Sequence, residues 1–143
     1  MALETKKRMR YGFTLFSVLL LSCFLVGTTK SDAFEITIDV SPNVLNIKSQ
    51  GEVVTVHTNI AYGMVEPLSI ILIVEDNSGV AISGWKADDR GYFVAKFLMS
   101  LIKDLDLEIN KYNTFTVKGS TIDGQNFSGS QDILVINNLP QKR

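Results

Sequence analysis

Beyond residue 33, apolar and polar positions alternate along most of the chain. Residues 34–40 show this most clearly, with phenylalanine, isoleucine and valine at every second position and Glu, Thr and Asp between them. A period of two is typical of strands that bury one face, and the intervening turn residues recur about every dozen positions. The pattern predicts strands over residues 34–40, 44–47, 53–60, 68–74, 80–85, 92–97 and 112–118, and a closing strand containing residues 127 and 133–136.

Three segments modify this pattern. Residues 68–74 are nearly all apolar, which predicts a central strand covered on both faces. Leu98, Leu101, Ile102 and Leu105 have helical spacing, which predicts one short helix crossing between two sheets. The dipeptide Asp123-Gly124 predicts a hairpin with a type I′ turn, which needs positive φ at both central positions.

Seven or eight strands and one crossover helix in about 110 residues are the dimensions of an immunoglobulin-like fold. The sequence therefore predicts an all-β class, an immunoglobulin-like β-sandwich, preceded by an N-terminal hydrophobic signal helix. The Cys…Trp…Cys core pattern of antibody domains is missing, because the only cysteine, Cys23, precedes the only tryptophan, Trp85, with no second cysteine. The expected likeness to immunoglobulins is therefore one of architecture.

The N-terminal segment has the layout of an export signal. Lys6, Lys7, Arg8 and Arg10 precede an uncharged run over residues 11–27, and small residues Ser31 and Ala33 follow at the −3 and −1 positions of a signal-peptidase site. A membrane-spanning helix needs about 20 apolar residues, more than this run offers comfortably. We predict a signal peptide over residues 1–33, cleaved between Ala33 and Phe34, and a domain over residues 34–143. A retained short membrane anchor is the alternative.

Two further interpretations compete for the same segment. Residues 20–23, Leu-Leu-Ser-Cys, resemble a bacterial lipobox that would lipidate Cys23, although the apolar run continues past this cysteine. Basic residues followed by Gly12-Phe13 resemble the processing site of a type IV prepilin, although Ser17 stands where that family has a glutamate. These interpretations predict a lipoprotein anchored through Cys23 or a pilin-like filament subunit processed between Gly12 and Phe13.

Composition excludes several classes of function. The chain has 143 residues, 45 % of them hydrophobic, with one cysteine, one histidine and a net charge of −1. One cysteine excludes a disulfide framework, and one cysteine with one histidine is too few for a structural zinc site. Without residues 1–33 the domain keeps nine basic and thirteen acidic residues, a charge of −4, which disfavours nucleic acid. We expect no cofactor, no metal and no membrane contact beyond the N-terminal segment.

Several phrases of the sequence resemble a known group of proteins. These are residues 39–47, 54–58, 87–97 and 119–127, which together span nearly the whole domain. They are similar to small exported bacterial domains with an immunoglobulin-like β-sandwich, a largely uncharacterised group. The resemblance implies an exported location and this fold, and it carries no catalytic motif.

Candidate catalytic and metal-binding residues are few. Nucleophilic catalysis of the Ser-His-Asp or Cys-His type would have to use His57, which alternation places on the same strand face as Val53 and Thr55. We expect a solvated or hydrogen-bonded strand histidine. Asp88 and Asp89, with Asp76 and Asn77 one hairpin away, offer oxygen ligands for Ca²⁺ without the spacing of a calcium loop, so we favour a polar turn. Asp104, Asp106 and Glu108 indicate a solvated helix face.

The most promising surface surrounds the loop at residues 86–91. Exposed aromatic side chains beside a loop commonly anchor carbohydrate or protein ligands, although Trp85 would equally suit the sandwich core. The candidate binding residues are Trp85, Lys86, Asp88, Asp89, Arg90 and Tyr92. The sequence as a whole predicts an exported, non-enzymatic module with a structural or binding role, its partner a protein or a surface glycan, in the periplasm, on the cell surface or outside the cell.

Overall fold

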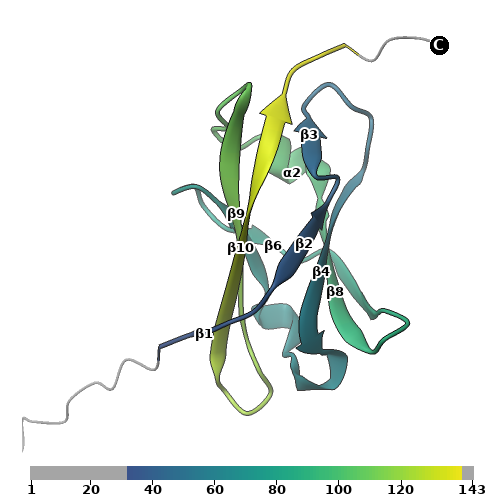
Figure 1. Cartoon of the computed structure of the whole chain (residues 1–143), viewed down its shortest axis with the longest axis vertical. Helices are drawn as coiled ribbons and strands as arrows, with labels where there is room; N and C mark the ends of the chain where they lie inside the picture. The colour runs from purple at the N-terminus through teal and green to yellow at the C-terminus, as the bar shows by residue number, and fades with distance from the viewer. Residues whose placement is uncertain (1–31, 140–143) are drawn as a thin grey trace, which may run out of the picture. The chain divides into compact units, whose positions relative to one another are not determined.

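The alternating pattern forms two β-sheets packed face to face in the computed structural model, which describes residues 32–139 (Figure 1). The four-stranded sheet has the order β2-β4-β8-β7, from β2 (Ile38–Ser41), β4 (Val53–Ala61), β8 (Tyr92–Leu98) and β7 (Gly84–Ala87). The six-stranded sheet has the order β1-β10-β9-β5-β6, and β3 also pairs with β10. Its strands are β1 (Phe34–Glu35), β3 (Val44–Asn46), β5 (Ile71–Val74), β6 (Val80–Ala81), β9 (Lys111–Ser120) and β10 (Asn126–Ile136).

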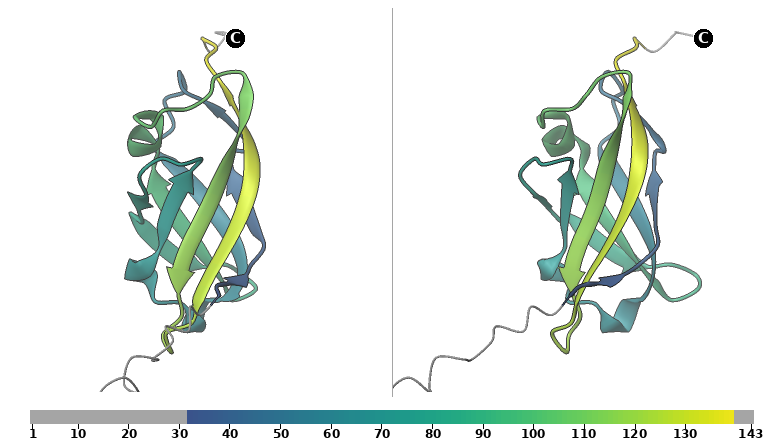
Figure 2. Two further views of the ribbon diagram at one scale, coloured as in Figure 1. Left: turned by 90° about the vertical axis from the view of Figure 1, so that its left-hand side faces the viewer. Right: turned by 60° about the vertical axis from the view of Figure 1, so that its left-hand side comes forward.

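The order of the strands is that of an immunoglobulin sandwich. Strands β2, β4, β8 and β7 take the places of A, B, E and D, and β5, β9 and β10 take those of C, F and G. The long β9–β10 hairpin runs along the length of the sandwich (Figure 2). The predicted all-β sandwich is therefore confirmed.

Two predicted strands are each divided between the sheets. Within residues 34–40, β1 pairs with β10 in one sheet and β2 pairs with β4 in the other. Within residues 80–85, β6 pairs with β5, and β7 begins at Gly84 in the opposite sheet. Alternation continues across both transitions because both sheets bury the same face of the chain. This is why the described residues contain ten strands where the sequence predicts seven or eight.

The prediction of a doubly covered strand over residues 68–74 is wrong. Pro67 starts a short 3-10 helix, η2 (Pro67–Ser69), and Leu68 is 78 % exposed. The strand β5 begins only at Ile71, whose side chain faces outward and is 36 % exposed, while Leu72 and Val74 are buried. Because isoleucine also occupies the outward positions, the sequence of a strand with one buried face resembled that of a strand covered on both faces.

Two of the connections between the sheets contain short helices. The predicted crossover helix is confirmed as α2 (Met99–Lys103), which carries the chain from β8 to β9. A second connection, from β4 to β5, contains η1 (Tyr62–Met64) and η2. Within residues 32–139, no helix combines the length and the apolar character needed to span a membrane.

The β9–β10 turn differs from the predicted type I′ geometry. Only Gly124 has positive φ, at 88°, and the Gly124 N–H donates to the Thr121 carbonyl oxygen at 2.9 Å. This is a type I turn followed by a left-handed glycine, a common longer hairpin loop. Because Asp123 keeps negative φ, the Asp-Gly pair predicted the hairpin correctly and its turn type wrongly.

Aromatic and β-branched side chains fill the space between the sheets. Phe93, Phe97, Phe115 and Phe127 are all fully buried. The inward residues of both sheets surround these rings as one cluster. A core of this size explains how a domain without cysteine can be stable.

Candidate functional site

All six predicted binding residues lie on one β-hairpin. Trp85 and Lys86 belong to β7, Tyr92 begins β8, and the turn between the strands holds Asp88, Asp89 and Arg90. The hairpin lies at one margin of the four-stranded sheet, because β7 is its last strand. It projects at the lower right of Figure 1.

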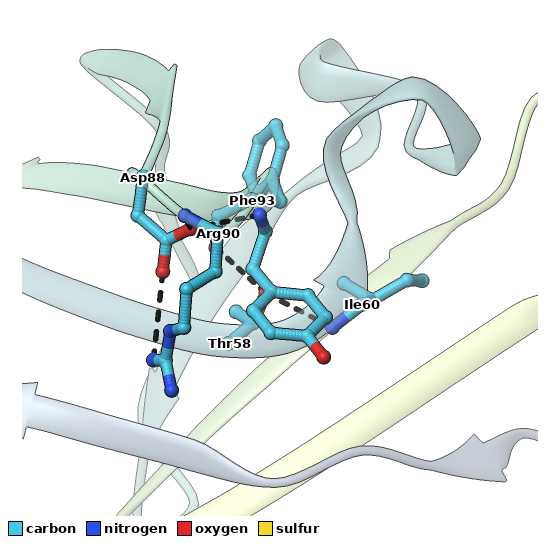
Figure 3. A network of polar contacts seen from close by, with 6 residues as sticks. Thr58, Ile60, Asp88, Arg90 and Phe93 are labelled. Atoms are coloured by element: carbon cyan, nitrogen blue, oxygen red, sulfur yellow. Dashed lines mark hydrogen bonds and ion pairs between the residues drawn. The ribbon is translucent and has the colours of Figure 1, made fainter.

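The Asp88 carboxylate organises the turn (Figure 3). Its Oδ1 accepts hydrogen bonds from the backbone N–H of Arg90 at 2.8 Å and of Tyr92 at 2.9 Å. Its Oδ2 lies 3.6 Å from Nη2 of Arg90. The Tyr92 N–H, together with the N–H and the charge of Arg90, lowers the pKa of Asp88 below its usual value, although partial burial opposes this shift.

The backbone of this turn has the same geometry as the β9–β10 turn. Gly91 has φ of 83°, its N–H donates to the Asp88 carbonyl at 3.0 Å, and the Asp88 N–H donates to the Tyr92 carbonyl at 2.9 Å. In the other hairpin, Thr121 Oγ1 accepts from the Gln125 N–H at 3.0 Å, as Asp88 does from Tyr92. The carboxylate of Asp88 therefore serves the turn, as the polar-turn interpretation predicts.

The turn displays cationic and aromatic side chains beside one another. The Arg90 guanidinium carbon lies 5.4 Å from the centre of the Tyr92 ring, and the Arg90 side chain is 76 % exposed. Lys86 and Asp89 are also exposed. Trp85 faces the same side of its sheet as the buried Ala95 but is 40 % exposed, because β7 is at the edge. Trp85 therefore lies at the rim of the core, between the exposed binding position and the buried core position that the sequence left open.

A shallow groove lies beside this hairpin. It is lined by Thr37, Ile38, Asp39, His57, Thr58, Asn59 and Arg90. Asp39 and His57 are directly paired across β2 and β4, and the Thr37 N–H donates to Asn59 Oδ1 at 2.9 Å. The groove thus offers a carboxylate, an imidazole, an amide and a guanidinium over two strands and one turn.

Thr58 is a structural residue of the groove that the sequence analysis missed. It is buried, its hydroxyl donates to the Phe93 carbonyl at 2.6 Å, and the Ile60 N–H donates to Thr58 Oγ1 at 3.4 Å (Figure 3). The pairing of β4 with β8 shifts register between His57 and Ala61, so this hydroxyl supports the backbone beside a bulge. The sequence did offer one signal for this role, because Thr58 is a polar residue at a position that the alternation directs into the core.

His57 lies where the alternation predicts, on the outward face of β4 with Val53 and Thr55. The ion pairs within residues 32–139 are Arg90–Asp88 and Lys111–Glu108, so His57 pairs there with no carboxylate. A histidine without an orienting acid lacks the geometry of a general base in a catalytic triad.

The oxygen ligands considered for Ca²⁺ do not come together. Asp76 and Asn77 follow β5 and line a groove with Asp106 and Glu108, and Asn77 Nδ2 donates to the Val74 carbonyl at 2.8 Å. From there, β6 and β7 carry the chain in one direction to Asp88, at the opposite end of the sandwich. Among residues 32–139, no cluster of three or more His, Cys, Asp or Glu side chains is placed to hold a metal ion.

The acidic residues predicted on a helix face lie outside the helix. The α-helix α2 ends at Lys103, and Asp104, Asp106 and Glu108 are exposed in the segment that leads to β9. Fully buried Asn113 holds this segment, because its Oδ1 accepts from the Glu108 N–H and its Nδ2 donates to the Glu108 carbonyl, both at 2.9 Å. Nothing in the local pattern signalled this role of Asn113.

The N-terminal predictions fall mostly outside the described residues. Gly12, Phe13 and Cys23 lie outside them, as does most of the predicted signal peptide. Ala33 and Phe34 are described, and Phe34 pairs with Phe127, the ring centroids 5.8 Å apart. Cleavage between Ala33 and Phe34 stays a prediction.

Comparisons with known proteins assign this chain to no family. No protein-family model matches the sequence, and no curated protein matches it. The crystal structure of CopC from Methylosinus trichosporium OB3b is similar to this chain with a TM-score of 0.42 and 15 % sequence identity. The match covers 75 % of this chain and 99 % of CopC.

Proposed function

We propose that the chain is exported and that residues 34–143 act as a non-enzymatic binding module for a protein partner. The binding surface is the β7–β8 hairpin, with Trp85, Lys86, Asp89 and Arg90 as its contact residues. Asp88 and Tyr92 position these residues.

The observation that carries this proposal is the hydrogen-bonded turn that presents the hairpin residues. The Asp88 carboxylate accepts two backbone N–H groups, which fixes the turn, and Arg90 rests over the Tyr92 ring. A surface that is ordered before binding loses less conformational entropy when a partner arrives. Tryptophan, tyrosine and arginine are also the side chains that most often dominate protein interfaces.

A surface glycan is the second candidate, and the groove beside the hairpin favours it. Asp39, His57 and Asn59 place acceptors and donors within one shallow depression, with Arg90 at its margin. Sugar hydroxyls both donate and accept hydrogen bonds, so a mixed lining of this kind suits them.

Export rests on the sequence of residues 1–33. The cationic start, the uncharged run and the small residues before Phe34 support a cleaved signal peptide. Lipidation of Cys23 and pilin-like processing between Gly12 and Phe13 are the alternatives, and either would leave the hairpin on the same domain.

Site-specific photo-cross-linking of the full chain in its native cell tests the proposal. A photoreactive residue at Asp89 should form an adduct with an envelope or extracellular protein, whereas the same residue at Lys118, on an outward face of the six-stranded sheet, should form none. Trp85→Ala should reduce the Asp89 adduct severalfold. An adduct that glycosidase treatment removes would favour the glycan, and equal adducts at both positions or no adduct at Asp89 would contradict the hairpin surface.

A further inference from the structure

The free edge of β7 presents backbone groups to solvent. Two hydrogen bonds at the ends of β8 show which way its backbone groups point. Toward β7, the Asp88 N–H donates to the Tyr92 carbonyl; on the side of β4, the Met99 N–H donates to the Glu52 carbonyl. In an antiparallel ladder, residues alternate between pointing toward one neighbour and toward the other. Lys86 therefore bonds toward Val94 of β8, and Trp85 and Ala87 direct their N–H and C=O groups away from β8. No other strand of residues 32–139 pairs with β7.

The opposite margin of the sandwich is closed by its own chain. Strands β1 and β3 both pair along β10, which covers the end of the six-stranded sheet. The outer edge of β2 is capped, because the Val40 N–H donates to Oε1 of Gln131 on β10 at 2.7 Å. On the other side of the sandwich, the outer strands are β6, with two residues, and β7, with four, so β7 is the longer edge open to a partner.

We propose that β7 accepts an extended segment of a protein partner, which adds as a fifth strand to the four-stranded sheet. This inference rests on the proposed function and specifies how the partner binds. The N–H and C=O groups of Trp85 and Ala87 lie two residues apart on the strand, the repeat with which an added strand forms its hydrogen bonds.

The side chains around this edge select the chemistry of the partner strand. Lys86 and Lys96 lie on the outward face of β7 and β8, so acidic residues fit the outward positions of an added strand. Trp85 and Ala87 lie on the inward face, and Trp85 is 40 % exposed at the rim of the core, so apolar residues fit the inward positions. The preferred segment alternates apolar and acidic residues.

Trp85 makes this interaction directly measurable, because it is the only tryptophan of the chain. The probe is a capped peptide of about ten residues in which valine and glutamate alternate, long enough to cover a four-residue strand. Titrated into the purified full chain, it should shift the Trp85 fluorescence to shorter wavelength. A matched peptide in which valine and lysine alternate should bind at least about tenfold more weakly, the size of a 1.4 kcal/mol difference.

Two variants with a matched control locate the peptide on the edge. Ala87→Pro removes an N–H that points away from β8 and should weaken binding at least about tenfold, whereas Ala87→Ser should bind as the wild type does. Lys86→Glu, which leaves the backbone intact, should reverse the preference between the two peptides.

Unchanged binding in a folded Ala87→Pro chain, an unchanged preference in Lys86→Glu, or no binding of the glutamate peptide would overturn strand addition. The cross-link at Asp89 reports separately on the proposed function. An adduct there without peptide binding would leave a binding module that does not use strand addition, and peptide binding without an adduct would show an edge that the native partner does not use.

Discussion

Asp88 and Thr121 hold equivalent positions in two hairpins that lie far apart in the sequence. Each accepts a hydrogen bond through its side chain from the N–H four residues later, and each precedes a glycine with positive φ by three residues. The sequence shows the glycines and predicts both turns. It does not show that the Asp88 carboxylate accepts hydrogen bonds from the turn backbone, because the sequence alone does not distinguish such a carboxylate from one that is free to bind a ligand.

The titration of Asp88 gives a prediction for stability against pH. Its pKa is lowered in the folded chain, so its contribution is fully present above the ordinary value of about 3.9 and is lost as the pH falls through the lowered folded value. Asp88→Asn keeps an acceptor and removes the titration. Urea midpoints followed from pH 7 to pH 2 should fall more steeply in the wild type, and parallel curves would contradict this role of the carboxylate.

The close packing of Gly129 against the chain between β1 and β2 gives a prediction for stability. A Cβ at Gly129 would lie 2.5 Å from the Ile36 carbonyl oxygen and 2.9 Å from Ile38 Cγ2. Gly129→Ala should therefore lower the free energy of unfolding by about 1–3 kcal/mol in urea denaturation. Gly63→Ala is the control, since nothing lies within 4 Å of its Cβ, and a loss as large there would refute the explanation.

At the scale of elements, alternation predicted most of the strands and the faces on which their residues point, although Pro67–Ser69 form a 3-10 helix. It placed His57 outward with Thr55, and the helical spacing around Ile102 located the crossover. It could not assign strands to sheets, because a chain that passes from one sheet to the other keeps burying the same side. The edge position of β7, on which the proposed binding depends, follows from pairing and is invisible in its sequence.

Asn113 provides the prediction at this scale, because one buried amide orders the segment from α2 to β9. Asn113→Ala leaves the N–H and the C=O of Glu108 without this partner. Each lost hydrogen bond costs about 0.5–1.5 kcal/mol, so the unfolding free energy should fall by about 1–3 kcal/mol in urea denaturation. Exposed Asn137→Ala is the matched control, and equal losses in the two variants would show that Asn113 does not act through these bonds.

At the scale of the whole molecule, the chain divides into a cationic, apolar start and an acidic β-sandwich. Fold class was predictable because composition, strand number and turn spacing all point to the same architecture. The six candidate binding residues are close neighbours in the sequence, and all of them lie on one hairpin. Their role in binding stays a prediction. The groove beside the hairpin could not be predicted, because Thr37, Asp39 and His57 come together only through the pairing of β2 with β4.

The proposed signal peptide predicts where the mature chain begins. We expect N-terminal sequencing of the protein from its native cell to start at Phe34. A start at Phe13 would favour the pilin-like alternative, a blocked and lipidated Cys23 would favour the lipoprotein, and an intact Met1 would support the retained anchor.

The claim that the free edge of β7 is the binding edge is tested most directly by amide hydrogen exchange along β7. Without peptide, the Lys86 amide should be protected and the Trp85 and Ala87 amides should exchange rapidly; with the valine–glutamate peptide, all three should be protected. Protection of Trp85 and Ala87 before the peptide is added, or rapid exchange at both after it has bound, would contradict the account.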